Sequence, residues 1–154
     1  MLASIRFISL LLTALLVGTM FGIWLGFNPA ALSAQAYVEM QQNTIRALNV
    51  ALPILGLACI VSTAALAMLT KHDQRTRYLL VAAALCLAAV GIITRFANQP
   101  INAIVIGWSP QAPPANWAEL RDTWWYWHGL RTMAGIAALA LALLADVGAR
   151  RRPG

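Results

Sequence analysis

The stretch RDTWWYWHGLRT, residues 121–132, gathers hydrogen-bonding and aromatic side chains in a chain of which only 10% of the residues are charged. Its Arg121, His128 and Arg131 are seven and three residues apart, so they lie on one face of a helix. Histidine titrates near neutral pH and can accept a proton from a weakly acidic carbon or phenol. A nearby guanidinium, helped by amide groups, can hold the oxyanion that develops. These residues therefore predict proton-transfer chemistry on an apolar substrate.

The same helical face extends over several turns, and its depth in a membrane decides where it points. At spacings of three and four residues the face continues through Trp117, Trp124 and Gly135. Counting back about 20 residues from Val147, the length of a membrane-spanning helix, places the outer edge of the span near His128. An arginine at this depth normally faces the bundle interior or a wet cavity, because exposure to hydrocarbon costs at least a few kcal/mol. We therefore expect His128 and Arg131 to point inward.

Polar side chains at the outer ends of the other helices are expected to meet this face. They are Glu39, Asn43, Arg46, Asn98 and Asn102. Tryptophan walls suit a flat aromatic ligand, and an opening on the lipid side suits an apolar one. We predict a pocket in the outer half of the bundle, whose substrate-binding side chains are Glu39, Asn43, Asn98, Arg121 and Trp124.

Two features of this region fit a simpler explanation. Tryptophan and tyrosine collect at membrane interfaces as an aromatic belt, and this is our interpretation of Trp125, Tyr126 and Trp127. Arginine can extend its head to the interface without marking a site. We interpret Arg95, at the end of the third apolar block, as such an anchor or as an ion-pair partner of a nearby carboxylate.

The elements that must position these residues are apolar helices. Hydrophobic residues make up 60% of the chain, and residues 7–27, 47–70 and 78–94 contain no charged side chain. A helix needs about 20 apolar residues to cross the hydrocarbon core. We predict an all-α fold, a bundle of four transmembrane helices at about residues 5–27, 34–70, 78–96 and 117–147, in one integral membrane domain over residues 1–154. Prolines between residues 97 and 116 predict an irregular outer loop between the third and fourth helices.

Local signals refine these helices. Pro53 should kink the second helix, and Asn116 followed by Glu119 predicts an N-cap, so that the last helix begins near Trp117. Small residues recur every four positions and predict close packing inside the bundle, with a dimer face as the alternative: Gly18, Gly22 and Gly26. The first block, followed by SAQA, also resembles a cleavable signal peptide. Its apolar run is longer than such a signal needs, so we expect a retained helix.

Membrane topology explains the net charge of +6. If four helices cross, one side of the membrane receives Arg6, Lys71, Arg75, Arg77, Arg150, Arg151 and Arg152. The other side receives fewer basic residues, and acidic residues offset them. The positive-inside rule then places both termini in the cytoplasm of a bacterial-type inner or plasma membrane, with membrane lipid as a partner. No signature of nucleic-acid binding accompanies the charge.

Metal ligands are scarce in the sequence. His128 is the only histidine expected on the outer side, whereas a zinc site usually takes three or four protein ligands. Cys59 and Cys86 lie within apolar blocks, without metal-binding spacing, and are interpreted as small buried side chains. We therefore predict no bound metal.

Three segments, taken in their order and spacing, resemble the anthrone oxygenase-like family of small four-helix membrane proteins. They are YVEMQQNTIRALNVALP at residues 37–53, NQPINAIVIGW at 98–108 and PPANWAELRDTWWYWHGLRT at 113–132. The likeness covers roughly residues 18–145. Its most specific part is the ordered set of Gln41 or Gln42, Asn43, Pro100, Asn102, Trp117, Arg121, Trp124, His128 and Arg131.

This resemblance implies an oxidoreductase that uses dioxygen. Characterised members of the family oxidise anthrones, which are three-ring phenols, to anthraquinones without a bound cofactor. Such a reaction would begin by removing a proton from the ring CH₂ group. We predict His128 as the catalytic base, with Arg131 and either Asn102 or Asn98 stabilising the enolate oxygen. No cofactor is expected, and the expected ligand is an apolar aromatic or quinone-like small molecule.

Other functions remain open. The chain could be a non-catalytic carrier that binds a lipophile, or an accessory protein that packs on a partner membrane protein or forms a homo-oligomer. A transporter is disfavoured, because the sequence holds no inverted repeat and its polar groups are confined to one half of the membrane.

Overall fold

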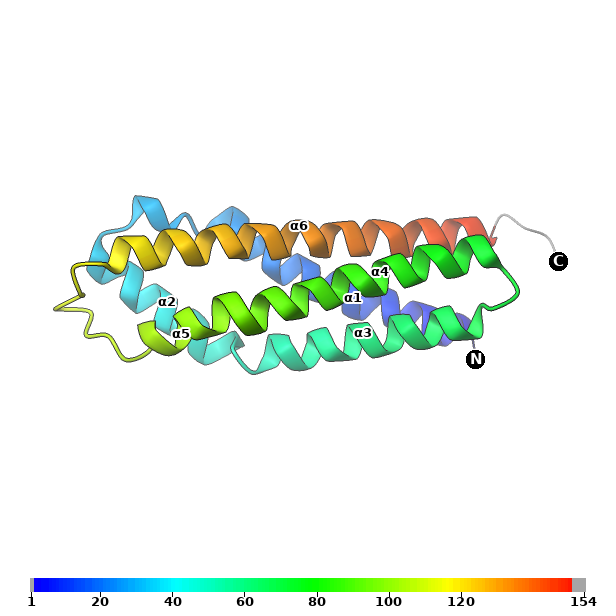
Figure 1. Cartoon of the computed structure of the whole chain (residues 1–154), viewed down its shortest axis with the longest axis horizontal. Helices are drawn as coiled ribbons and strands as arrows, with labels where there is room; N and C mark the ends of the chain where they lie inside the picture. Colours follow the sequence, from blue (N-terminus) through cyan, green and yellow to red (C-terminus); the bar gives the residue numbers. More distant parts are fainter. Residues whose placement is uncertain (1, 151–154) are drawn as a thin grey trace.

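Long apolar helices lie side by side in the computed structural model, which describes residues 2–150 (Figure 1). The elements are α1 (Leu2–Gly26), the 3-10 turn η1 (Pro29–Ala31), α2 (Ala34–Leu48), α3 (Ala51–Leu69), α4 (Gln74–Ile93), the π turn η2 (Thr94–Asn98), α5 (Gln99–Val105) and α6 (Trp117–Arg150). Within residues 2–150, extended pairing is limited to one isolated bridge between Ser109 and Ala112. The predicted all-α fold is confirmed.

Membrane spans account for the length of these helices. Over the described residues, four helical segments are long and apolar enough to cross a bilayer: Leu2–Ala31, Ala51–Leu69, Gln74–Val105 and Trp117–Ala149. Large apolar side chains such as Leu57, Met68 and Leu85 are exposed on the outside of the bundle. In water this surface would be unfavourable, whereas lipid solvates it. The chain is a multi-pass membrane protein.

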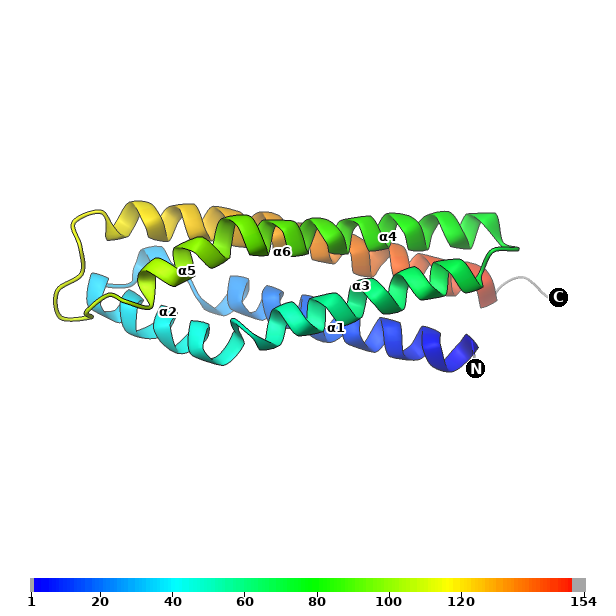
Figure 2. The ribbon, with the colours of Figure 1, turned by 60° about the horizontal axis from the view of Figure 1, so that its bottom comes forward.

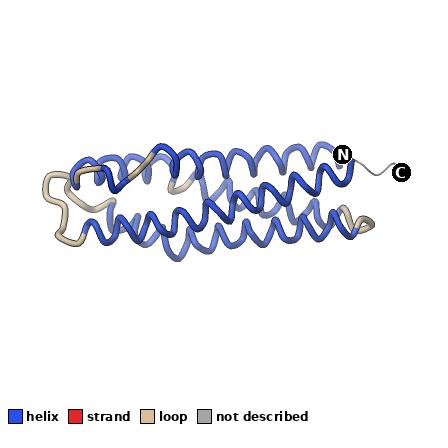
Figure 3. Tube along the Cα trace, turned by 90° about the horizontal axis from the view of Figure 1, so that it is seen from above, coloured by secondary structure: helices blue, strands red, loops and turns tan. Residues whose placement is uncertain are grey.

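The two ends of the bundle differ. The start of α1, the turn between α3 and α4 and the end of α6 lie at one end (Figures 1 and 2). The short helices α2 and α5 lie at the other end (Figure 1), where the long connection from residue 106 to residue 116 is drawn as loop (Figure 3). Arg151 and Arg152, which contributed to the predicted charge asymmetry, lie outside the described residues, as does the side chain of Arg150.

Four helices enclose the bundle interior: α6 packs against α4 and α1, and α3 packs against the same two helices. Its central apolar cluster consists of Leu16, Val17, Met20, Cys59, Leu87, Val90 and Ala138. The close approach of α1 to α6 depends on Gly135, where an added Cβ would lie 2.7 Å from Met20 Cε. The glycines expected to pack inside the bundle do not: a Cβ at Gly18, Gly22 or Gly26 would meet nothing within 4 Å.

Side-chain caps explain where several helices begin. Ser33 Oγ accepts a hydrogen bond from the Ala36 N–H at 3.3 Å at the start of α2. At the start of α4, Asp73 Oδ1 accepts from the Thr76 N–H at 3.2 Å. Such caps satisfy N–H groups that have no partner within the helix. The last helix begins at Trp117, as the sequence predicted.

The predicted helix over residues 34–70 is divided at Asn49 and Val50 into α2 and α3. Because Pro53 has no N–H, it cannot donate to the carbonyl of Asn49, and the helix ends there. A new helix starts one turn before the proline, where the Ile54 N–H donates to the Val50 carbonyl at 3.3 Å. The sequence predicted a kinked helix at Pro53. Instead, one helix ends a few residues before the proline and a second helix begins.

The predicted irregular loop from residue 97 is in fact helical as far as Val105. A π turn over Thr94–Asn98 joins α4 to α5, and the Gln99 N–H donates to the Thr94 carbonyl across this wider turn. Pro100 therefore stands in the first turn of α5, where a missing N–H is tolerated. The irregular connection is limited to residues 106–116, and the π turn and α5 carry Asn98 and Asn102, respectively, into the bundle.

Candidate functional site

His128 lies on the inner face of α6, with none of its surface exposed. Its Nε2 lies 3.1 Å from the carbonyl oxygen of Met20 on α1, and its Nδ1 lies 3.2 Å and 2.9 Å from Nε and Nη2 of Arg131. A carbonyl only accepts, so these partners assign the proton to Nε2. Nδ1 then accepts from Arg131, and both ring nitrogens are engaged.

Arg131 has only 7% of its surface exposed. Besides its bonds to His128, its Nη1 donates to Thr94 Oγ1 in the π turn at 3.1 Å. A guanidinium carries five N–H donors, so these contacts leave part of its donor capacity unused. The guanidinium is thus held in place from two sides while it retains donors for a further acceptor.

An aromatic cluster encloses the imidazole. Trp124 stacks on His128 with ring centroids 4.9 Å apart and an interplanar angle of 4°, and Trp125 lies 5.7 Å from His128 at 24°. The edge of Phe27 meets both tryptophans. Our assignment of Trp125 to an outer belt missed this role, although its spacing of three residues from His128 was a usable signal. Tyr126, by contrast, is 61% exposed.

Asn102 joins three elements beneath this cluster. Its Oδ1 accepts from Trp124 Nε1 at 2.8 Å and from Gln41 Nε2 at 3.4 Å, and its Nδ2 donates to Asn49 Oδ1 at 2.9 Å. Asn98 is fully buried and donates to the Trp124 carbonyl at 3.0 Å. Both asparagines therefore lie next to the inward face of α6, where the sequence analysis expected them.

The α2 side chains expected at this place lie elsewhere. Glu39 and Asn43 are exposed, and Glu39 Oε1 accepts from Gln35 Nε2 at 3.0 Å on the same helix. Arg46, expected beside them, is exposed as well. Their predicted place in the pocket is corrected: this face of α2 turns away from His128 and Arg131.

The opposite face of α2 points inward because it carries the apolar side chains. Tyr37 and Ile45 are buried there, and Gln41 and Gln42 lie on the same face. Gln42 Nε2 donates to the Val105 carbonyl at 3.0 Å, and so ties α2 to α5. Tyr37, Gln41 and Ile45 recur every four residues, so helical spacing is the sequence signal that places the glutamine on the buried face.

Arg121 lies near the start of α6 and does not line a cavity with Arg131. Its Nε donates to Asp122 Oδ1 at 2.8 Å, and its guanidinium lies 4.8 Å from the Trp117 ring. Close by, burial raises the pKa of the Tyr37 phenol well above its ordinary value, although the charge of Arg121 opposes this effect. Arg121 is therefore placed to order the first turns of α6.

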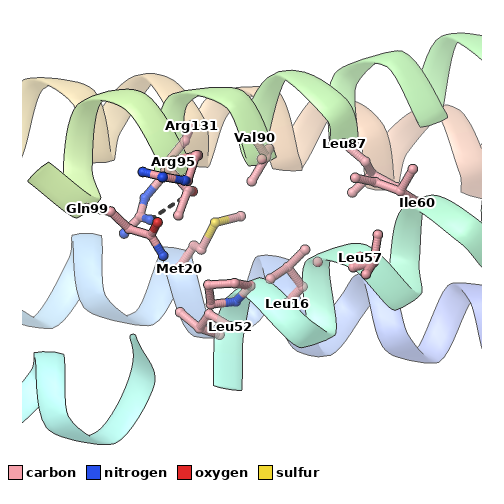
Figure 4. A pocket seen from close by; sticks show the side chains of 14 residues that line it. Leu16, Met20, Leu52, Leu57, Ile60, Leu87, Val90, Arg95, Gln99 and Arg131 are labelled. Carbon is pink, nitrogen blue, oxygen red and sulfur yellow. Dashed lines mark hydrogen bonds between the residues drawn. The ribbon is translucent and has the colours of Figure 1, made fainter. Parts of the chain in front are cut away.

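A cavity of about 230 Å³ lies beside Arg131, between the four long helices. Its apolar wall includes Leu16, Met20, Leu52, Leu57, Ile60, Leu87 and Val90, and its polar end is formed by Thr94, Arg95, Gln99 and Arg131 (Figure 4). The exposed lining residues Leu57, Gly91 and Arg95 place its opening between α3 and α4, toward lipid. His128 does not line it.

A second, smaller cavity of about 30 Å³ lies on the other side of Arg131. It is lined by the amide side chains of Gln41, Asn49 and Asn102, with Trp124. Four residues that line these two cavities were not predicted from the sequence to line a pocket: Gln41, Asn49, Arg95 and Gln99. Arg131 is the one charged residue among the described side chains that lines both cavities.

Metal ligands are not gathered at this place. Among residues 2–150, no three His, Cys, Asp or Glu side chains lie close enough together to hold a metal ion. What the arrangement offers is a fixed cation at the end of an apolar cavity. Such a cation can stabilise negative charge on a ligand oxygen.

The family model described as anthrone oxygenase matches residues 42–141. This range contains His128, Arg131, Asn102 and every lining residue of the larger cavity except those from α1. No curated protein and no solved structure matches the chain.

Proposed function

Because the chain belongs to the anthrone oxygenase family, we propose that it is a membrane oxygenase acting on a flat apolar molecule held beside Arg131. The observation that carries this proposal is the cavity of about 230 Å³, apolar along its length and cationic at one end. An aromatic ring system fits the apolar wall, and its ring oxygen fits the guanidinium. A substrate dissolved in the membrane reaches the cavity through the opening between α3 and α4.

The reaction we propose converts a ring CH₂ group to a carbonyl. One C–H proton leaves and the electron pair spreads onto the ring oxygen, where Arg131 stabilises the charge. Dioxygen then bonds to the carbon, the second C–H bond and the O–O bond break, and one oxygen atom leaves as water. The dioxygen accepts all the electrons that the carbon loses. The reaction is therefore balanced without a further reductant, and we propose that it proceeds without a cofactor.

His128 has a different role in this proposal from the one expected from the sequence. Its Nδ1 already accepts from Arg131, and the ring has no surface in the cavity. We assign His128 to positioning Arg131, and water at the polar end of the cavity to receiving the proton. Asn102 supports the position of His128 indirectly, because it binds Trp124, whose ring stacks on the imidazole.

The orientation in the membrane follows from charge. Arg6, Lys71, Arg75 and Arg77 lie at the end that holds the start of α1 and the α3–α4 turn. By the positive-inside rule we propose that this end faces the cytoplasm of a bacterial-type plasma membrane. The polar end of the cavity then lies in the outer half of the bilayer.

The test uses the purified chain in detergent, an anthrone and dissolved oxygen. Arg131→Met keeps much of the side-chain length but removes the charge, and Arg77→Met is the matched control at an exposed position. We expect oxygen uptake and quinone absorbance from the wild type and the control, and a rate lower by about 10²–10³ for Arg131→Met. Equal rates for all three proteins and for buffer would refute the proposal.

A second function, binding without chemistry, is favoured by one observation. His128 is fully engaged, and in the described part of the chain no Asp, Glu or His lines the larger cavity as an alternative base. A carrier of apolar molecules would use the same cavity and the same arginine. Saturable binding of an anthrone that is lost in Arg131→Met, without oxygen uptake above that of buffer, would establish this function in place of the first.

A further inference from the structure

The polar end of the larger cavity has an excess of hydrogen-bond donors. Arg131 retains unused N–H groups after binding His128 and Thr94. Arg95 contacts the ring of Phe96, and the described residues offer it no ion pair. The side-chain amide of Gln99 has no hydrogen-bond partner among the described residues. Figure 4 shows Arg95, Gln99 and Arg131 gathered at one end of the cavity.

This end of the cavity also carries uncompensated charge. Among residues 2–149, no Asp or Glu lines the cavity, so Arg95 and Arg131 bring two positive charges that none of these residues neutralises. Both belong to segments that cross the membrane, where an unpaired charge is unfavourable. An anion on the ligand would offset this cost, and a carboxylate matches the planar fork of a guanidinium.

We propose that the ligand of this cavity carries a carboxylate beside the ring oxygen, so that the substrate is an aromatic acid. Arg131 holds the ring oxygen, whereas Arg95, with Gln99, holds the carboxylate at the opening. Arg95 thereby selects the substrate, while Arg131 serves the chemistry. This assignment rests on the proposed substrate site, but binding tests it without any turnover.

The probes are two fluorescent molecules of the same ring system, 9-anthracenecarboxylate and the neutral 9-anthracenemethanol. Binding is titrated at pH 7 with the full chain in a neutral detergent. We expect the carboxylate to bind about 10- to 100-fold more tightly than the alcohol, as for a hydrogen-bonded charged pair. Because Arg95 is exposed, Arg95→Met should fold normally, which a single symmetric gel-filtration peak would verify.

The decisive quantity is the preference of each variant for the carboxylate over the alcohol, measured as the ratio of the two dissociation constants. Arg95→Met should lose most of the preference for the carboxylate and keep its affinity for the alcohol, while Arg77→Met should behave as the wild type. Equal binding of the two probes by the wild type would overturn the proposal, and so would an undiminished preference in Arg95→Met. Oxygen uptake with a neutral anthrone would still support the oxygenase in either case.

A second arm identifies the source of the carboxylate. A membrane fatty acid offers the same group on an apolar body, so dodecanoate is added as a competitor. Failure of dodecanoate to displace 9-anthracenecarboxylate supports an aromatic acid as the ligand. Complete displacement at low dodecanoate concentration supports carboxylate recognition but overturns the aromatic assignment. Selective carboxylate binding without oxygen uptake would support this carboxylate site and refute the proposed oxygenase activity.

Discussion

Substitutions of His128 distinguish whether this side chain positions Arg131 or acts as the catalytic base. Alanine removes the acceptor for two N–H groups of Arg131, at 3.2 Å and 2.9 Å, and the ring stacked on Trp124. Losing hydrogen bonds to a charged group costs roughly 1.5–3 kcal/mol, and truncating a buried aromatic side chain costs about 3–5 kcal/mol in all. Asparagine can place its amide oxygen near the position of Nδ1, so His128→Asn should lose less.

We expect His128→Ala to lose more stability and more activity than His128→Asn. In His128→Ala the guanidinium loses one of its two anchors, and the rate of anthrone oxidation should fall by about 10²–10³. His128→Asn should retain more than a tenth of the wild-type kcat, although an amide cannot act as a base near neutral pH. The readouts are thermal unfolding in detergent and a separation of kcat from KM. The control is His72→Ala, at an exposed position in the α3–α4 turn.

One result would refute this reasoning. If His128→Asn folds with nearly wild-type stability but is as inactive as His128→Ala, the imidazole itself takes the proton. The original assignment of His128 as the base would then stand. A normal rate in His128→Ala would show instead that neither role is needed.

Three further substitutions test the packing around the site. Gly91→Leu should leave the unfolding temperature unchanged, since its Cβ would meet only Ile60 Cδ1 at 3.9 Å. The leucine side chain should narrow the cavity and lower kcat/KM for a three-ring substrate by about 10- to 200-fold, measured by oxygen uptake. Gly135→Ala should be less stable than the control Gly148→Ala by roughly 1–3 kcal/mol in chemical unfolding. Both gain helix propensity, but only the first crowds neighbours: the movable end of Met20 at 2.7 Å and the stiff, β-branched Val17 Cγ2 at 3.2 Å. Equal stabilities would contradict the close packing of α1 on α6. Burial raises the pKa of Tyr37, so the free energy of unfolding should fall as pH rises above about 10, and Tyr37→Phe should lessen this fall; identical pH profiles would contradict it.

The inward face of α6 could be predicted because two physical constraints agree there. Helical spacing puts His128 and Arg131 on one face, and the cost of exposing a charge to lipid turns that face inward. Both side chains are buried in the structure. The hydrogen bond from His128 to Met20 could not be predicted, because the carbonyl belongs to a helix more than a hundred residues away.

The orientation of α2 was harder to predict, because both of its faces carry polar residues. Glu39 and Asn43 share one face, while Gln41 shares the other with Tyr37 and Ile45. Burial of the two apolar side chains decides the orientation and carries the glutamine inward with them. Charge alone was a misleading guide to function in this helix.

The π turn escaped prediction for a different reason. Pro100 is a sound signal for the end of an α-helix, since it removes a backbone donor. A wider turn can absorb the missing bond, and no local pattern distinguishes this outcome from a loop. The consequence is functional, because the turn places Thr94 on Arg131 and Asn98 on Trp124.

The most direct test of the central claim is a structure of the full chain with an anthrone bound under anaerobic conditions. The account predicts ring density along the apolar wall near Leu87 and Val90, with the ketone oxygen about 3 Å from the guanidinium of Arg131. Ring density elsewhere on the bundle, with Arg131 bonded only to His128 and Thr94, would contradict it.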